Sequence, residues 1–421
     1  MHPTAFGPLV RSIGIAVGLA VALTPFAGAV RAQISQPFTP SGSVELAPGI
    51  LYTQGTMRTA GRLPQMVRVA TIDPRVPTAR IRSLLSNDLV IQRERPSKLA
   101  MRKSTPNLKA MVAINGGMSV EGRQDAYAAP ISLHVSDGEV WVAQACTYPT
   151  LGVDPAGGAR IADVRLHATM TEVGRKVDKQ IHRVNTHRDD AKVVLFTHRF
   201  ASSTQTAPGG VEVVLAMEDV LRPNGQQTVR VTDVRRGEGN TPLAPGMAVL
   251  SVGGSTNDWV RKMHVGDRYV LKTTIVRNVN NSCGGVIDAA PGWGDVVETL
   301  GGNEWTARDG RVAAPSRTAY PAGSERHPRT GVGVTADGRV LMVTVDGRRP
   351  GYSIGVSLKE MGKLMLTLGA QYAFNLDGGG STVMARRFTS TDKFKVANKP
   401  SDGRERLATQ ALAVYQVIPG A

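Results

Sequence analysis

Residues 375–381 read NLDGGGS and place a carboxylate, an amide, three consecutive glycines and a hydroxyl close together. Short, mainly apolar segments lie before and after this stretch, at 372–374 and 382–384, so it is predicted to connect two strands. Consecutive glycines are entropically costly and suit a backbone that needs positive φ or touches a ligand. One interpretation is a tight hairpin with a capping aspartate. The other is an active-site loop in which Asp377 does chemistry and the glycine amides hold an anionic or hydroxylated ligand.

A second carboxylate, Asp346, has a similar setting, because it follows the predicted strand 340–345 and precedes a glycine. Two carboxylates at strand ends can face each other across a cleft, and such a pair is the usual equipment for cleaving glycosidic bonds. An aspartate before glycine is also a common turn former. A further strand end, at 111–114, runs into Asn115-Gly116-Gly117 and repeats the pattern of a polar residue followed by glycines.

Arginines accompany these strand ends. Arg329 stands just before the predicted strand 331–335, and Arg348 and Arg349 follow Asp346. Guanidinium groups bind phosphate oxygens bidentately, so these residues favour an anionic substrate. The sequence lacks the Gly-x-Ser-x-Gly elbow of serine hydrolases, the Lys-Ser/Thr of a P-loop, and a GxGxxG segment between a strand and a helix.

The elements that position these residues are predicted to be mostly strands. Residues 150–280 contain apolar runs separated by polar loops and no strong helix, which indicates a β-rich middle region. The clearest helix covers 357–368, where Ser357 and Glu360 form a capping box ahead of one apolar face. A surface helix is predicted within 86–107. We therefore expect an α+β fold with a central mixed or antiparallel sheet and few helices.

The composition is that of a globular protein, with 421 residues, 41% hydrophobic and 20% charged. Lys and Arg number 50 against 34 Asp and Glu, and the resulting formal charge of +16 favours anionic partners. Basic residues occur in pairs at most, without interleaved aromatics or zinc-finger spacing, so nucleic acid is not an expected partner.

Residues 1–32 are typical of a signal peptide. Arg11 precedes the apolar run 13–23, and Val30-Arg31-Ala32 supplies small residues at the cleavage positions. The run is shorter than the about 20 residues that span a membrane. We therefore expect an exported protein, periplasmic or secreted, without a transmembrane segment after cleavage.

Only two cysteines occur, Cys146 and Cys283. Their wide separation, without CxxC spacing, argues against zinc binding and thiol redox chemistry. In an exported protein we expect one disulfide between them, with two isolated buried thiols as the alternative.

Five motifs occur in order along the chain: AINGG (113–117), HPRTGVGV (327–334), VDGR (345–348), NLDGGGST (375–382) and NKPSDGR (398–404). Together they resemble the phosphodiester glycosidase (NAGPA-type) family over residues 105–418, and Arg183-Val184-Asn185 is similar to its middle region. The resemblance implies removal of a sugar from a sugar-1-phosphodiester. Met118 and Ser119 stand where the family often has an aromatic pair, which leaves the sugar identity open.

The resemblance also implies a site. Asp377 is expected nearest the anomeric carbon, with Asp346 as its partner or orienting group, while Arg329 and Arg348 hold the phosphate. The substrate-binding residues implied are Asn115, Gly116, Gly117, Arg329, Arg348, Asn375, Gly378, Gly379, Gly380, Ser381, Asn398 and Arg404. No cofactor is expected to be required, and a divalent cation bridging a carboxylate and the phosphate stays open.

The predicted organisation is a signal peptide (1–32), a lead-in with edge strands (33–104) and a phosphodiester glycosidase domain (105–418). The predicted function is an exported hydrolase that cleaves a sugar from a sugar-1-phosphodiester, or a related cell-envelope glycan, by carbon–oxygen cleavage. Two alternatives are a non-catalytic envelope protein that binds anionic polysaccharide and a glycoside hydrolase without a phosphate requirement. The sequence sets neither the aglycone nor the oligomeric state.

The signal peptide gives a direct prediction, which is that the exported protein begins at Gln33. Its first 32 residues carry two positive charges, Arg11 and Arg31, so cleavage lowers the formal charge from +16 to +14. Intact-mass measurement of protein recovered from the periplasm or the medium should show the shortened chain. Exported material that keeps Met1 would contradict the prediction.

Overall fold

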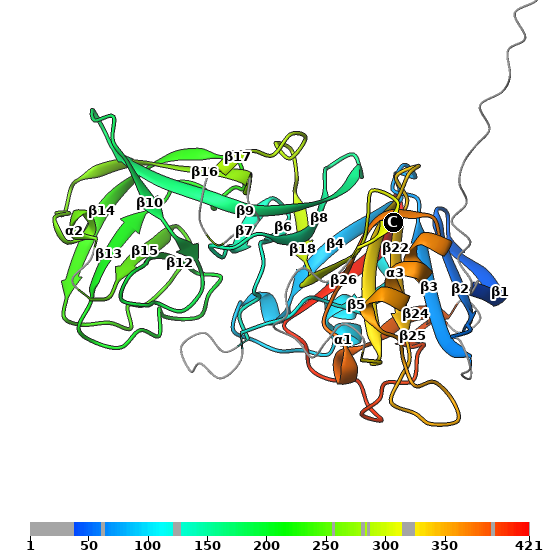
Figure 1. Ribbon diagram of the computed structural model, residues 1–421. Helices are drawn as coiled ribbons and strands as arrows, with labels where there is room; N and C mark the ends of the chain where they lie inside the picture. Colours follow the sequence, from blue (N-terminus) through cyan, green and yellow to red (C-terminus); the bar gives the residue numbers. More distant parts are fainter. Residues whose placement is uncertain are drawn as a thin grey trace, which may run out of the picture. The chain divides into compact units, whose positions relative to one another are not determined.

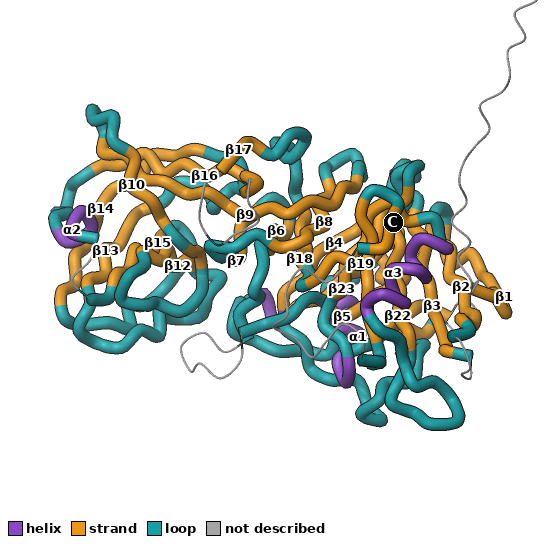
Figure 2. The backbone as a smooth tube through the Cα atoms, in the orientation of Figure 1, coloured by secondary structure: helices purple, strands orange, loops and turns teal. Residues whose placement is uncertain are grey.

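The computed structural model describes residues 38–59, 64–120, 128–254, 257–278, 283, 287–313, 325–388 and 392–420. The predicted signal peptide lies outside the described residues. Strands dominate the described chain, and its α-helices are α1 (Pro96–Arg102), α2 (Asp258–Arg261) and α3 (Leu358–Thr367), as Figures 1 and 2 show. The expected β-rich α+β fold is confirmed. None of these helices has the length and apolar character needed to cross a membrane.

An eight-stranded antiparallel sheet contains the predicted strand ends of Arg329, Asp346 and Asn375. In spatial order its strands are β1 (Phe38–Ala47), β2 (Ile50–Met57), β3 (Gln65–Ile72), β22 (Val340–Val345), β21 (Arg329–Thr335), β23 (Ala370–Asn375), β19 (Glu304–Arg308) and β20 (Arg311–Val312). The lead-in strands thus join this sheet directly, because β3 pairs with β22 over Val67↔Val345 to Ile72↔Val340.

A five-stranded antiparallel sheet holds the strand that ends in Asn115. Its order is β25 (Lys393–Val396), β24 (Met384–Phe388), β5 (Leu108–Asn115), β26 (Gln410–Val417) and β4 (Ala79–Leu85). The first half of the chain and its C-terminal strand therefore meet in one sheet, with Ile114 paired to both Met384 and Leu412.

The middle region forms a third sheet, as its alternating pattern predicts. Its main path runs through β11 (Arg183–Val184), β12 (Val193–Thr197), β15 (Met247–Val252), β13 (Val211–Ala216), β14 (Gln226–Arg236), β16 (Arg268–Asn278), β9 (Ala159–Glu172), β8 (Tyr148–Val153), β18 (Glu298–Gly301), β6 (His134–Ser136) and β7 (Glu139–Val142). Two further strands, β10 (Asp178–Ile181) and β17 (Ile287–Ala289), pair with β9 and β16. Only the β11–β12 pair among these is parallel.

The eight- and five-stranded sheets pack on each other. Val332 and Phe374 of the first sheet and Ile114 and Leu412 of the second belong to one buried apolar cluster. Side chains alternate along a strand. In β22, Val340 and Met342 belong to this cluster, whereas Leu341 between them faces the opposite side and packs under α3. The site residues therefore come from the ends of strands held rigidly by two-sided packing.

Helix α3 covers the outer face of the eight-stranded sheet (Figure 1). The predicted capping box is confirmed: Ser357 Oγ accepts from the Glu360 amide at 3.2 Å, and Glu360 Oε2 accepts from the Ser357 amide at 2.9 Å. A Cβ on Gly331 would lie 2.6 Å from the Met361 methyl carbon, so glycine here leaves room for a side chain of the helix.

The helix predicted within 86–107 is shorter than expected. Helix α1 covers only Pro96–Arg102, and a 3₁₀ turn, η1 (Ser86–Asp88), precedes it. Arg95 is extended (φ −70°, ψ 129°), as the residue before a proline prefers to be. Pro96 lacks an amide hydrogen and suits only the first turn of a helix, so it sets where α1 begins.

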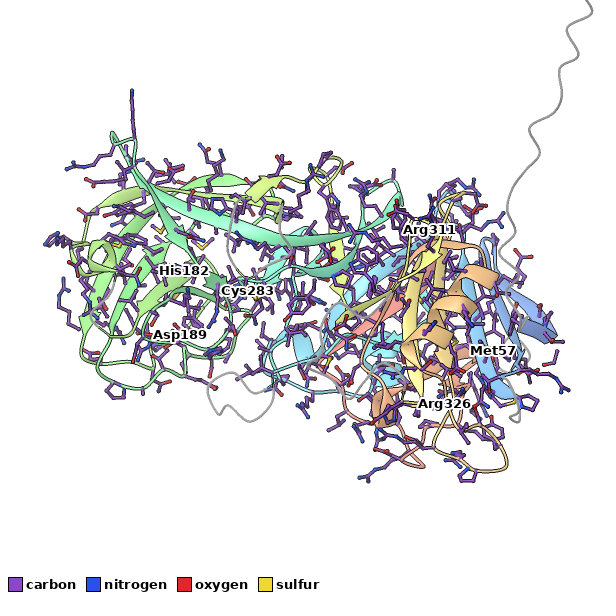
Figure 3. All side chains as sticks on the ribbon, viewed as in Figure 1. Met57, His182, Asp189, Cys283, Arg311 and Arg326 are labelled. Carbon is purple, nitrogen blue, oxygen red and sulfur yellow. A yellow bond between two sulfur atoms is a disulfide. The ribbon has the colours of Figure 1, made fainter. Side chains whose placement is uncertain are left out.

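The predicted disulfide between Cys146 and Cys283 is present, and the two residues are 137 apart in sequence. Cys283 is labelled in Figure 3 beside the strands of the third sheet. Among the described residues no cysteine is free. The bond closes a long loop that contains most of that sheet.

Loss of this disulfide should destabilise the protein. In the chain-entropy model, a loop of this length corresponds to about 4 to 5 kcal/mol of free energy of unfolding, so the double variant Cys146→Ala/Cys283→Ala should unfold at lower denaturant concentration. Reduced wild-type protein is the matched control and should lose a similar amount. Thiol titration of unfolded, non-reduced protein should find none. Two titratable thiols there would contradict the assignment.

Candidate active site

The NLDGGGS stretch crosses from one sheet to the other. Strand β23 ends at Asn375 in the eight-stranded sheet, and β24 begins at Met384 in the five-stranded sheet. A short 3₁₀ turn, η2 (Gly379–Ser381), lies between them. The hairpin interpretation is therefore wrong, because the two flanking strands do not pair with each other. The loop bridges the packed sheets and carries Asp377 at their junction.

The buried side chain of Asn115 holds this loop in place. Its Nδ2 donates to the Asp377 carbonyl at 2.8 Å and to the Gly116 carbonyl at 3.1 Å. Its Oδ1 accepts from Thr330 Oγ1 at 2.8 Å and from the Val383 amide at 3.1 Å. All four contacts are internal, so Asn115 positions the loop, and it also lines the larger compartment described below.

Two of the three glycines lie where a side chain would collide with an arginine. A Cβ on Gly379 would lie 2.9 Å from an Nη atom of Arg348, and Gly379 also has φ +61°. A Cβ on Gly380 would overlap the guanidinium of Arg406. Gly378 lies against the Pro328 carbonyl, where a Cβ would approach to 2.9 Å. The glycines thus let two guanidinium groups pack directly on the loop backbone.

Two connected compartments meet at Asp377. The larger has a volume of about 610 Å³ and is lined by the Asn-Gly-Gly segment, Ser381 and the chain from Arg406 to Thr409. The smaller, of about 290 Å³, is lined by the glycines of the loop and by Arg329 and Arg348. Both are also lined by Met118, Asp377 and Arg406. Asp377 is partly exposed, so its carboxylate is accessible at the junction.

Positive charge is concentrated in the smaller compartment. Burial, and secondly the nearby Arg348 cation, lowers the pKa of the Arg329 guanidinium to about 10. Arg329 therefore stays charged at neutral pH, three units below that value. Its Nε donates to the Val356 carbonyl and its Nη2 to the Glu325 carbonyl, each at 3.2 Å. Two like charges held together in a cleft are typical of a functional site.

Arg348 is oriented by both its backbone and its side chain. Its φ of +57° is unusual for a residue with a side chain, and such backbone conformations concentrate at functional sites. Its Nη2 donates to His327 Nδ1 at 3.4 Å, while His327 Nε2 donates to Glu325 Oε2 at 3.1 Å. His327 therefore links Glu325 to Arg348 on the wall of the smaller compartment.

Asn375 adds an acceptor to the smaller compartment. The residue is 2% exposed and its Nδ2 donates to Asn303 Oδ1 at 2.9 Å. Its Oδ1 has no hydrogen-bond partner within the described part of the chain. Buried polar atoms are normally paired, so a hydroxyl group of a ligand could donate the missing hydrogen bond to Asn375 Oδ1.

The second predicted carboxylate, Asp346, lies elsewhere. It is 1% exposed and lines neither compartment. Its Oδ2 accepts from Arg68 Nη1 at 2.7 Å and from Tyr352 OH at 2.9 Å, and its Oδ1 accepts from Asn398 Nδ2 at 3.0 Å. Asn398 also donates to the Thr382 carbonyl at 3.1 Å. Asp346 and Asn398 therefore brace the end of the Asp377 loop from behind.

Some of the other predicted residues line a compartment and one does not. Gly116 and Gly117 line the larger compartment with Ser381, and the Gly116 carbonyl accepts from the Asp377 amide at 3.2 Å. Arg404 is exposed and lines neither compartment.

The sequence analysis missed four lining residues, Arg93, Arg406, Asn303 and Glu325. Arg406 had one readable signal, because Asp402 stands four residues before it and the two form an ion pair at 2.6 Å. Arg93 had none. It is brought to the site by an isolated bridge between Glu94 and Ala408, which are 314 positions apart.

The described residues contain no group of three or more His, Cys, Asp or Glu side chains placed to hold a metal ion.

The fold and the site define a β-rich protein whose cleft combines two carboxylates, Asp377 and Glu325, with several arginines. Residues 220–415 match the phosphodiester glycosidase (NAGPA) family and form a domain of that family. The resemblance predicted from the motifs is thereby confirmed over these residues. The Asn-Gly-Gly segment at 115–117 precedes the matched region, although the structure brings it to the same site.

Two solved structures are similar in fold. A hypothetical protein from Synechocystis has a TM-score of 0.71 at 17% identity, covering 90% of this chain and 64% of that chain. The second is a protein from Burkholderia pseudomallei K96243 that is named as an exported protein. It has a TM-score of 0.63 at 21% identity, and the match covers 83% of this chain and 74% of that chain. At these identities the likeness shows the fold alone.

One curated relative is the SPbeta prophage-derived uncharacterized protein YomE of Bacillus subtilis (strain 168). It is 34% identical over 110 residues, which are 26% of this chain. The matched segment spans only 16% of the relative's length.

Because Asn115 holds the Asp377 loop by hydrogen bonds, the variant Asn115→Ala should loosen this loop. The change leaves the Thr330 hydroxyl, the Val383 amide and the Asp377 carbonyl without their partner, and each buried orphan costs about 1 to 3 kcal/mol. We expect the free energy of unfolding to fall by at least about 2 kcal/mol, with faster amide hydrogen exchange at 376–383. Asn107→Ala, at an exposed asparagine, is the control. An unchanged rate of amide hydrogen exchange at 376–383 would contradict the assigned role of Asn115 in holding the loop.

Proposed function

We propose that this protein is an exported hydrolase that releases a sugar from a sugar-1-phosphodiester of a cell-envelope glycan. The family match supports glycosidase chemistry on phosphodiester-linked sugars. The substrate sits across the Asp377 loop, with the sugar C1 beside the Asp377 carboxylate. Its phosphate lies in the smaller compartment beside Arg329 and Arg348.

One observation carries the proposal. A single loop backbone places the partly exposed Asp377 next to a compartment lined by three arginines, Arg329, Arg348 and Arg406, with Arg348 close to Gly379. Carboxylates stabilise the oxocarbenium-like transition state of glycoside cleavage. Guanidinium groups stabilise the charge that develops on a departing phosphate. The two halves of the scissile bond thus each meet the group that their developing charge requires.

The phosphate leaving group also explains why the reaction needs no second carboxylate as a proton donor, and Glu325, which lines the smaller compartment, contacts His327 instead. The departing phosphate oxygen is weakly basic, so the arginines can stabilise it without full proton donation. Asp346, which the sequence suggested as a partner or orienting group, acts through position, because it accepts from Asn398 Nδ2, which also donates to the Thr382 carbonyl after Asp377. His327 is bonded to Arg348 and orients it.

Cleavage is proposed at the carbon–oxygen bond rather than at phosphorus. Asp377→Asn should lower kcat by at least about 100-fold, the low end for acid–base catalysis, while the unfolding midpoint stays close to that of wild type. Asp219→Asn, at an exposed aspartate paired to Arg222, is the matched control and should keep wild-type activity.

Hydrolysis of a small sugar-1-phosphodiester in oxygen-18 water tests the bond that breaks. The label should appear on the C1 hydroxyl of the released sugar, as read by mass spectrometry. Label in the released phosphate would show attack on phosphorus and would overturn the glycosidase proposal. Equal hydrolysis of a neutral glycoside of the same sugar would overturn the phosphate requirement.

A further inference from the structure

We propose that this protein has a second, non-catalytic glycan-binding site, a hollow at one end of the strand pair β9–β16 that takes an anionic sugar unit of the glycan substrate. The choice of a glycan as the ligand rests on the proposed function, whereas the hollow and its unpaired donors do not. The hollow has a volume of about 460 Å³ and shares no lining residue with the two compartments at Asp377. It therefore lies outside the catalytic cleft.

The hollow forms where three segments of the third sheet meet. Glu172 ends β9 and pairs with Tyr269 near the start of β16. Lys179 lies on β10, which pairs with β9, and Trp259 lies on the short helix α2 (Figure 1). Trp259 also packs against the buried apolar cluster of this sheet. The wall that it forms is therefore held by the fold.

The carboxylates of the hollow already have partners inside the protein, whereas its lysines do not. Glu172 Oε2 lies 2.9 Å from Arg175 Nε, and Asp267 Oδ2 accepts from the backbone amide three residues earlier at 2.8 Å. Lys179 and Lys262 line the hollow and form no hydrogen bond or ion pair with any residue that the structure describes. Two ammonium groups are thus available to form charge-assisted hydrogen bonds with an anion.

Tyr269 lines the same hollow with an unpaired hydroxyl. The residue is 7% exposed, and its hydroxyl has no hydrogen-bond partner in the described part of the chain. Burial, and after it the nearby carboxylates of Asp267 and Glu172, raise the pKa of Tyr269 to about 12, so the hydroxyl keeps its proton at neutral pH. Because buried polar groups are normally paired, a ligand oxygen that accepts from this hydroxyl would complete it.

The apolar part of the lining favours a sugar over a bare inorganic anion. Val177 is 60% exposed, and Trp259 is partly exposed. An inorganic phosphate would use the lysines and leave these apolar surfaces uncovered, whereas the C–H groups of a sugar ring can pack on them. The volume also falls within the range of roughly 300 to 1,000 Å³ that is usual for ligand sites. A sugar that carries a phosphate or a carboxylate meets both requirements.

A second site of this kind favours long chains over short ones. Once one part of a polymer is bound, another part binds from a high effective concentration, provided that the chain spans both sites. A small phosphodiester occupies the compartments at Asp377 alone. Substrate length therefore separates the role of the hollow from that of the catalytic residues.

Tryptophan fluorescence measures binding at the hollow directly. The other three tryptophans, Trp141, Trp293 and Trp305, are each exposed by 5% or less, so acrylamide should quench Trp259 most. The mature protein carrying Asp377→Asn, which should bind without turnover, is titrated with a bacterial poly(glycosyl-1-phosphate) and separately with neutral dextran. We expect the anionic polymer to protect Trp259 from acrylamide and dextran to leave the quenching unchanged. The variant Trp259→Phe should lose this protection signal.

The double variant Lys179→Gln/Lys262→Gln, in the same Asp377→Asn protein, tests the cations. Its Kd for the anionic polymer, measured by calorimetry, should rise at least about tenfold, because two charge-assisted hydrogen bonds are lost. Its Kd for a small methyl phosphodiester of the same sugar should not change. The matched control is Lys98→Gln/Lys395→Gln, which removes two exposed lysines outside the hollow and should leave both Kd values unchanged.

The results separate this inference from the proposed function. If the anionic polymer does not protect Trp259, or if the lysine double variant keeps its Kd for the polymer, the inference is wrong, and hydrolysis of the small diester by wild-type protein still supports the proposed function. Equal protection by dextran would overturn the requirement for an anion. Protection by vesicles of phosphatidylglycerol and phosphatidylcholine, with none by the polymer, would identify a membrane as the ligand and also overturn the inference. If wild-type protein hydrolyses neither substrate while the polymer protects Trp259, the proposed function falls and the second site stands.

Discussion

The site depends on one buried carboxamide. Asn115 ends a strand of the five-stranded sheet, yet it bonds Thr330 of the eight-stranded sheet and both ends of the loop that joins the two sheets. An aspartate could not donate to the Asp377 carbonyl, and a hydroxyl could not make all four contacts. Because the amide is fully used inside the protein, the position of Asp377 is set before any ligand binds.

A second constraint is the close approach of arginines to the loop backbone. Glycine leaves room for guanidinium groups to lie close to consecutive peptide units, and Gly379 is also favoured by its φ of +61°. The consequence is electrostatic. Cations stand within reach of a ligand that also touches Asp377, and burial together with mutual repulsion lowers the pKa of Arg329. A bound anion would relieve that repulsion.

The two strand-end aspartates show how environment separates similar residues. Both precede glycine after an apolar strand, but Asp346 is enclosed by Arg68, Tyr352 and Asn398 whereas Asp377 opens onto two compartments. Removing one partner from a buried ion pair leaves an uncompensated charge and is strongly destabilising. Asp346 therefore contributes to the site through the stability of the surrounding chain.

Local features could be predicted from the amino-acid sequence: the capping box of α3, the strands of the hairpin β21–β22, the β-rich middle region, the disulfide partners and the family motifs. These depend on residue type and short spacing, which a chain displays directly. Three other features emerged only when the chain was folded: β23 and β24 belong to different sheets, Asp346 is enclosed, and Arg93 and Arg406 reach the cleft. Those facts depend on pairing between distant segments, such as Glu94 with Ala408, which no local pattern encodes.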